Sequence, residues 1–117
     1  MVCHLSDAFR MVMHQKHASP AGSIVQSTLI KWIALYLPVK WPPGVPTRPE
    51  MDQEVGGTNP GDFAVDLAEL ETLLERVATV PKDYQWPPHP IFGKMSESAW
   101  MRWAYLHVDH HLRQFDL

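Results

Sequence analysis

Two histidines near the end of the sequence, His107 and His111, have a spacing that would let them bind one metal ion together. Residues four apart on an α-helix are rotated by only about 40° and stand one turn above each other. Both imidazoles can then direct a ring nitrogen to the same point, as paired helical histidines do in zinc enzymes. The spacing alone is a weak signal, because many helical histidine pairs only form hydrogen bonds.

The helix that would carry this pair is expected from an N-cap at Ser96 to about residue 115, and it has three faces. The charged face must be exposed to solvent, so we expect the histidine face and the apolar face to be buried. Inward-pointing imidazoles need partners, which a metal ion would supply. The histidine face holds Trp100, Trp103, Ala104, His107, His111 and Gln114; the apolar face holds Met101, Tyr105, Val108, Leu112 and Phe115; the charged face holds Arg102, Asp109, Arg113 and Asp116.

The candidate third ligand is His4, which lies on an apolar stripe of an expected N-terminal helix. Three neutral imidazoles plus water make an open site of the catalytic type, suited to zinc, nickel or iron. Asp7, one turn further along, could orient His4 or bind the metal itself. His110 could act beside the ligands or replace one of them, and Gln114 could hydrogen-bond near a bound water. We therefore name His110, Gln114 and Asp7 as candidate catalytic residues.

Four helical segments and no convincing strand are predicted, so the expected fold class is all-α. Apolar residues recur every three or four positions over residues 2–15, 23–37, 59–79 and 96–115. In the third segment Asn59-Pro60 is expected to start the helix. Its expected buried face consists of Phe63, Leu67, Leu70, Leu74 and Val77.

Two proline- and glycine-rich connections, residues 38–60 and 86–93, join these helices. A long loop in a small domain is either functional or disordered, and Trp41 in the first connection indicates order. We expect both connections to wall the metal site. For Trp86 and Phe92, plain packing against the helices is an equally good interpretation.

Length and composition limit the remaining possibilities. The 117 residues predict a single domain over residues 1–117. A formal net charge of -3 without a basic cluster argues against nucleic acid. One cysteine, Cys3, excludes an internal disulfide, fits a reducing compartment, and is most simply a small buried apolar residue. No apolar run reaches membrane-spanning length and no signal peptide is indicated, so a cytoplasmic location without membrane contact is expected.

Several stretches resemble a known superfamily. The loop His89-Pro-Ile-Phe92-Gly93 and the final run His107-Val-Asp-His110-His111-Leu-Arg-Gln-Phe115 are similar to the DinB-like (DinB/YfiT-like) superfamily of helical metal proteins. The likeness is greatest to an uncharacterised branch, a domain of unknown function, with an HPxFG loop and an HxxHHLRQF final helix. The stretches at residues 4–10, 41–50 and 56–60 also resemble that branch, so the resemblance covers nearly the whole chain.

The resemblance implies a DinB-like four-helix bundle in which three histidines hold a divalent metal, at the positions of His4, His107 and His111. Relatives of this kind carry a first helix and a tryptophan-containing turn ahead of the segment that matches Val2-Cys-His4, and this sequence lacks both. Either the sequence is a truncated form of a longer domain, or a neighbouring subunit covers the apolar surface so left open. Such a surface favours self-association, most simply as a homodimer, or aggregation.

The function that follows is a metal-dependent enzyme acting on a small-molecule substrate. The metal would activate a water for hydrolysis or a thiol for transfer, as some DinB-like relatives do with low-molecular-weight thiols. The alternative is a non-catalytic helical module that binds a metal or a partner without turnover, in which Cys3 could be a further ligand. Heme or flavin binding is a third possibility that no cofactor motif in the sequence supports.

Overall fold

The structure is a computed structural model that describes residues 1–21, 24–43 and 47–117, with the side chains of residues 24–27 outside the description. It contains four α-helices, namely α1 (Val2–Val12), α2 (Ile24–Tyr36), α3 (Phe63–Ala78) and α4 (Glu97–Gln114), and one short 3-10 helix, η1 (Pro49–Met51). The described ranges hold no strand, only an isolated bridge between His89 and Gly93. The predicted all-α class is confirmed.

The chain divides into two compact units. The first unit comprises Met1–Ser19 and Thr47–Pro87, and the second comprises Pro20–Pro46 and Pro88–Leu117. That residues 1–117 form one domain stays a prediction. None of the helices in the described part of the chain is both long enough and apolar enough to cross a membrane.

The helix ends follow local capping chemistry, which differs at two places from the prediction. The first helix ends at Val12 rather than near residue 15, because His14 has a left-handed backbone with φ 58°. The third helix starts at Phe63 rather than at Asn59-Pro60, because Asp62 accepts the Val65 N–H at 3.1 Å. Ser96 caps α4 as predicted, its hydroxyl accepting the Ala99 N–H at 3.2 Å.

The predicted start of the second helix, at residue 23, lies outside the described residues. From Ile24 onward the helix is confirmed, and it ends at Tyr36. Gly44 and its two neighbours in the first proline-rich connection also lie outside the described residues.

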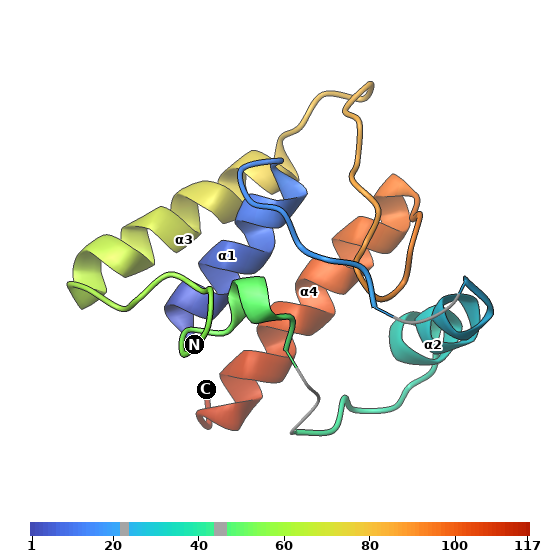
Figure 1. Ribbon diagram of the computed structural model, residues 1–117, viewed down its shortest axis with the longest axis horizontal. Coiled ribbons are helices and arrows are strands. Elements are labelled where there is room, and N and C mark those ends of the chain that lie inside the picture. The colour runs from blue at the N-terminus through green and yellow to red at the C-terminus, as the bar shows by residue number, and fades with distance from the viewer. Residues whose placement is uncertain (22–23, 44–46) are drawn as a thin grey trace. The chain divides into compact units, whose positions relative to one another are not determined.

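In the first unit, α1 and α3 lie side by side (Figure 1). The prediction for α3 was partly wrong, because its contact face is shifted toward the C-terminal end: Phe63 is 68% exposed, Leu67 is also exposed and Leu74 is only half-buried. Periodicity predicts the direction of an apolar face but not how far the neighbouring helix extends along it. The buried apolar residues of these two helices are Cys3, Leu5, Ala8, Phe9, Met11 and Val12 of α1 and Leu70, Leu73 and Val77 of α3.

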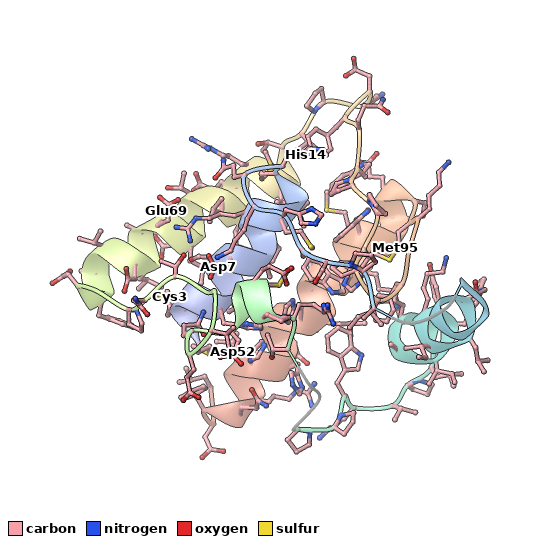
Figure 2. All side chains as sticks on the ribbon, in the orientation of Figure 1. Cys3, Asp7, His14, Asp52, Glu69 and Met95 are labelled. Atoms are coloured by element: carbon pink, nitrogen blue, oxygen red, sulfur yellow. The ribbon has the colours of Figure 1, made fainter. Side chains whose placement is uncertain are left out.

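The loop that leads into α3 is tied to α1 through Asp7, a fully buried carboxylate (Figure 2). Thr58 donates to Asp7 twice, from its backbone N–H and from its hydroxyl, both at 2.7 Å. Arg10 and Lys16 form ion pairs with the same carboxylate at 3.0 and 3.2 Å. Burial alone would raise the pKa of Asp7, but the Thr58, Lys16 and Arg10 hydrogen bonds outweigh it and lower that pKa.

In the second unit, α2 packs against α4. Arg102 of α4 donates to the carbonyl of Leu35, whose side chain is fully buried. The predicted apolar face of α4 was wrong at two of its five positions, because Tyr105 is 69% and Phe115 58% exposed. The fully enclosed part of α4 is its first half, at Ala99, Trp100 and Trp103.

The turn before Thr58 requires a glycine, and this gives a stability prediction. A Cβ at Gly57 would lie 2.7 Å from the carbonyl carbon of Asp52, so Gly57→Ala must displace backbone. We expect it to lower the free energy of unfolding by about 1–3 kcal/mol. Gly61→Ala is the matched control, since its Cβ would come no nearer than 3.8 Å to Asp66, and it should stay within about 0.5 kcal/mol of wild type. Equal midpoints for both variants in urea unfolding would contradict the packing described.

Candidate metal centre

The histidine stripe of α4, which runs from Trp103 through His107 to His111, places the two histidines side by side as predicted, but its end is less buried than predicted because Gln114 is exposed. The rings of His107 and His111 have centroids 5.0 Å apart, and the ring of Trp103 lies 4.8 Å from that of His107. Both histidines are half-buried, whereas Trp103 is buried. The stripe therefore begins among tryptophans and becomes more open toward the end of the helix.

Gln114 holds the ring of His111 in place. The Nδ1 atom of His111 lies 2.9 Å from Oε1 of Gln114, one turn further along α4. An amide oxygen can only accept, so Nδ1 carries the proton and Nε2 is the nitrogen with the lone pair. Metal-binding histidines usually have such a partner on their second ring nitrogen.

Trp41, from the first proline-rich connection, lies against His107 and its neighbour His110. Its ring centroid is 6.1 Å from that of His107 and 5.8 Å from that of His110. Its Nε1–H donates to the carbonyl of Ala34 at 2.8 Å, which fixes the indole relative to α2. His110 in turn contacts His111, with centroids 5.1 Å apart. The Trp41 indole thus lies beside the histidine stripe.

The candidate ligand His4 lies on α1 in the first unit and is half-buried. Its Nδ1 lies 3.1 Å from the carbonyl oxygen of Met51 in η1, so Nδ1–H donates and Nε2 keeps the lone pair. Burial lowers the pKa of His4, against a smaller opposite effect of the Met51 hydrogen bond. His4 is therefore a neutral imidazole near neutral pH, which is the form that binds metal.

Asp7 and Cys3 have structural partners within the first unit. Both carboxylate oxygens of Asp7 accept from Thr58, and His4 uses the Met51 carbonyl for its Nδ1. Cys3 is buried, and its Sγ lies 3.5 Å from a carboxylate oxygen of Asp66. Burial and then the Asp66 hydrogen bond raise the pKa of the Cys3 thiol, so it is neutral and unreactive.

One histidine with a clear role, His89, was not singled out from the sequence. It is 7% exposed, and its Nδ1 accepts the backbone N–H groups of Ile91 and Phe92 at 3.0 and 3.1 Å. Its ring stacks on Phe92 with centroids 4.4 Å apart, and Gly93 closes the turn with φ 69°. The HPxFG pattern could have indicated this role. A side chain that accepts hydrogen bonds from the backbone N–H groups two and three residues later commonly stabilises a turn.

These features define a class: an all-helical chain whose last helix carries a paired-histidine stripe beside a histidine-organised loop. The chain belongs to the family described as Protein of unknown function (DUF1569), whose family model matches residues 4–116. The match includes His4, His89 and the whole of α4. No curated protein and no solved structure matches the chain.

The burial of His89 predicts how stability depends on pH. Burial lowers the pKa of His89 from 6.5 to about 3, so between these values the unfolded chain binds a proton that the folded chain does not. The free energy of unfolding should therefore fall as the pH drops below about 6.5, by up to about 1.4 kcal/mol per pH unit from this residue. His4 shifts in the same direction and adds to the loss.

The measurement is urea unfolding at several pH values between 7 and 4. His89→Asn supplies an acceptor oxygen for the same N–H groups without a group that titrates in this range, so its dependence on pH should be clearly shallower. His17→Asn, at an exposed position, is the matched control and should keep the wild-type slope. Identical slopes for His89→Asn and wild type would show that His89 is not buried as described.

Proposed function

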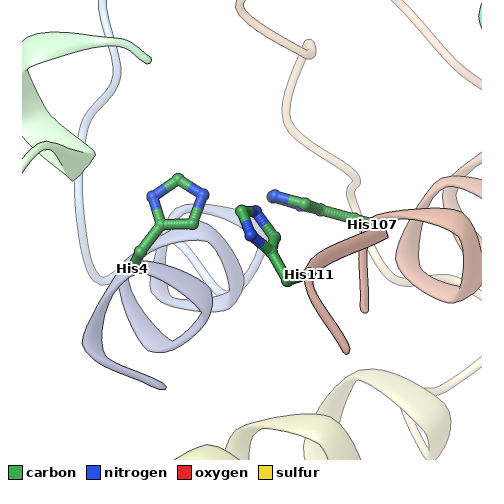
Figure 3. A group of neighbouring side chains, drawn as sticks. All are labelled: His4, His107 and His111. Atoms are coloured by element: carbon green, nitrogen blue, oxygen red, sulfur yellow. The ribbon is translucent and has the colours of Figure 1, made fainter. Parts of the chain in front are cut away.

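We propose that His4, His107 and His111 bind one divalent transition metal ion, zinc, nickel or iron, and that the protein is a metal-dependent enzyme of the DinB-like type. The site would act on a small molecule by hydrolysis or by thiol transfer. The observation that supports this best is the grouping of one ring nitrogen from each of the three histidines, within 4.8 Å of one another, drawn in Figure 3. The joining of the two units at this point is part of the proposal.

The tautomers support the same ligand set. His4 and His111 each have a protein oxygen on Nδ1, from Met51 and Gln114, so both would bind through Nε2. A carbonyl or amide oxygen in that position orients the ring and makes the coordinating nitrogen more basic. The two residues come from opposite ends of the sequence and share this arrangement, which is typical of metal ligands.

Three imidazoles leave a coordination position open, and a metal held in this way lowers the pKa of a water or thiol bound to it. Among the chain's own residues, Trp41 would exclude solvent from one side of the histidine stripe. His110, beside both Trp41 and His111, is the best-placed candidate to move a proton. Gln114 would position His111 rather than contact substrate, because its amide oxygen is used by that ring.

A passive metal-binding module is the second candidate. Of the three candidate catalytic residues, Asp7 is engaged by Thr58, Arg10 and Lys16, and Gln114 by His111. Of these three candidates, His110 alone is left for acid–base chemistry. A site with a single candidate for proton transfer supports a module that binds metal without turnover. Activity that is lost on chelation and restored by zinc or nickel would distinguish the enzyme from the module.

The metal content of the purified protein tests the site itself. We expect close to one transition metal ion per chain by elemental analysis. His107→Ala combined with His111→Ala should abolish it, and His4→Ala should reduce it strongly, because two imidazoles alone bind weakly. His17→Ala is the matched control, since His17 is exposed and lies outside α1.

Two results would contradict the proposal. If metal remains in the double variant, α4 does not hold it. If His4→Ala has no effect while the double variant loses the metal, the third ligand is wrong and the first unit takes no part in binding.

Gln114 offers a finer test of the ligand geometry. Gln114→Ala should weaken metal affinity by about 10- to 100-fold, the usual effect of removing the partner of a ligating histidine. Gln114→Glu keeps an acceptor oxygen at the same distance and should retain most of the affinity. Competition with a chromophoric chelator measures both. An affinity unchanged in Gln114→Ala would mean that His111 does not bind through Nε2.

A further inference from the structure

The outer face of α2 is apolar and exposed. Leu29, Trp32, Ile33 and Tyr36 follow the i, i+3, i+4, i+7 spacing of one helix face, and Ile30 and Leu37 flank them. Trp32 is 57% and Leu29 64% exposed. Among the described side chains of α2 the buried one is Leu35, which lies on the side toward α4. Among its described side chains, the helix thus buries Leu35 and exposes the broader apolar stripe to solvent.

No charged side chain interrupts this stripe among the described residues of α2. Lys31 lies on another side of the helix, and its Nζ is 3.4 Å from the carbonyl oxygen of Lys94. Arg102 of α4 lies at the edge, with its guanidinium carbon 5.4 Å from the Tyr36 ring centre, and donates to the Leu35 carbonyl. Trp32 and Tyr36 contact each other, with centroids 4.7 Å apart. The stripe is therefore an uncharged surface with an ordered aromatic pair.

The size of the stripe matches one half of a dimer interface. The exposed fractions of its six side chains correspond to on the order of 600 Å² of surface, so two copies would bury about 1,200 Å², where stable interfaces begin. Val39, 60% exposed just beyond the helix, would add to the rim. A patch of this size is at the upper limit of what a typical monomer exposes.

We infer that α2 is the surface through which two copies of this chain pair around a two-fold axis. In such an interface the same patch lies on both copies, so a charge near the axis would face its equal while an apolar stripe is complementary to itself. Trp32 and Tyr36 are the residue types that anchor interfaces. The stripe itself carries no charge and the chain has a net charge of -3, so electrostatic attraction to an anionic membrane does not favour that occupant. This pairing is independent of the metal site.

The oligomeric state of the full chain tests the inference. Sedimentation at micromolar concentrations should give twice the 13.4 kDa of one chain. Trp32→Glu and, separately, Ile33→Glu should weaken the dimer at least about 30-fold, the effect of losing a main anchor or burying a like-charge pair. Both positions are exposed, so circular dichroism should confirm unchanged helix content. Val65→Glu, at a 67% exposed valine of α3, is the matched control and should stay dimeric.

Each other outcome overturns the inference. A wild-type monomer at about 100 µM means that the α2 face has no such partner. A dimer that persists in both α2 variants, or that dissociates equally in Val65→Glu, places the interface elsewhere. A monomer that binds vesicles of anionic lipid through Trp32 makes the stripe a membrane-contacting face instead.

Discussion

The buried carboxylate of Asp7 is the interaction on which the first unit depends. It accepts two hydrogen bonds from Thr58 and pairs with two cations, so the end of the loop that leads into α3 is fixed to α1. Within that loop, η1 presents the Met51 carbonyl to His4. A charge buried without such partners would be very costly, and here each of its oxygens has at least two donors. Asp7 thus helps to orient the candidate ligand His4 indirectly, by fixing the loop that presents the Met51 carbonyl, and it need not contact the metal.

In the second unit a candidate ligand is oriented by a residue close to it in the sequence. His111 is oriented by Gln114 one helical turn away, so the ligand and its support belong to a single rigid element. His89 organises the loop just before that helix, and its ring also lies 5.5 Å from the Trp100 ring. His89 and His111 therefore have different roles: His89 stabilises the loop, and His111 belongs to the candidate metal centre. Their different depth of burial reflects that division.

Much of the fold could be predicted, because helices are recognised from the local periodicity of apolar residues. The four helical segments, the Ser96 cap and the neighbouring positions of His107 and His111 all follow from residues close together in the sequence. The early end of α1 could not, because it depends on a histidine adopting positive φ. Pairs such as His4 with Met51 or Asp7 with Thr58 are about fifty residues apart, and no local pattern specifies them. The exposed Tyr105 was mispredicted for a related reason: an apolar face indicates a partner without saying where that partner ends.

The burial of Cys3 has a practical side. Its sulfur is enclosed, stays protonated and lies beside an acidic group, and it is the chain's single cysteine. Electrophiles and oxidants act on exposed thiolates, so the native fold shields this atom from both. Thiol-directed labels should therefore not react with the native protein. A dye or spin probe attached to one introduced surface cysteine would report on that position alone.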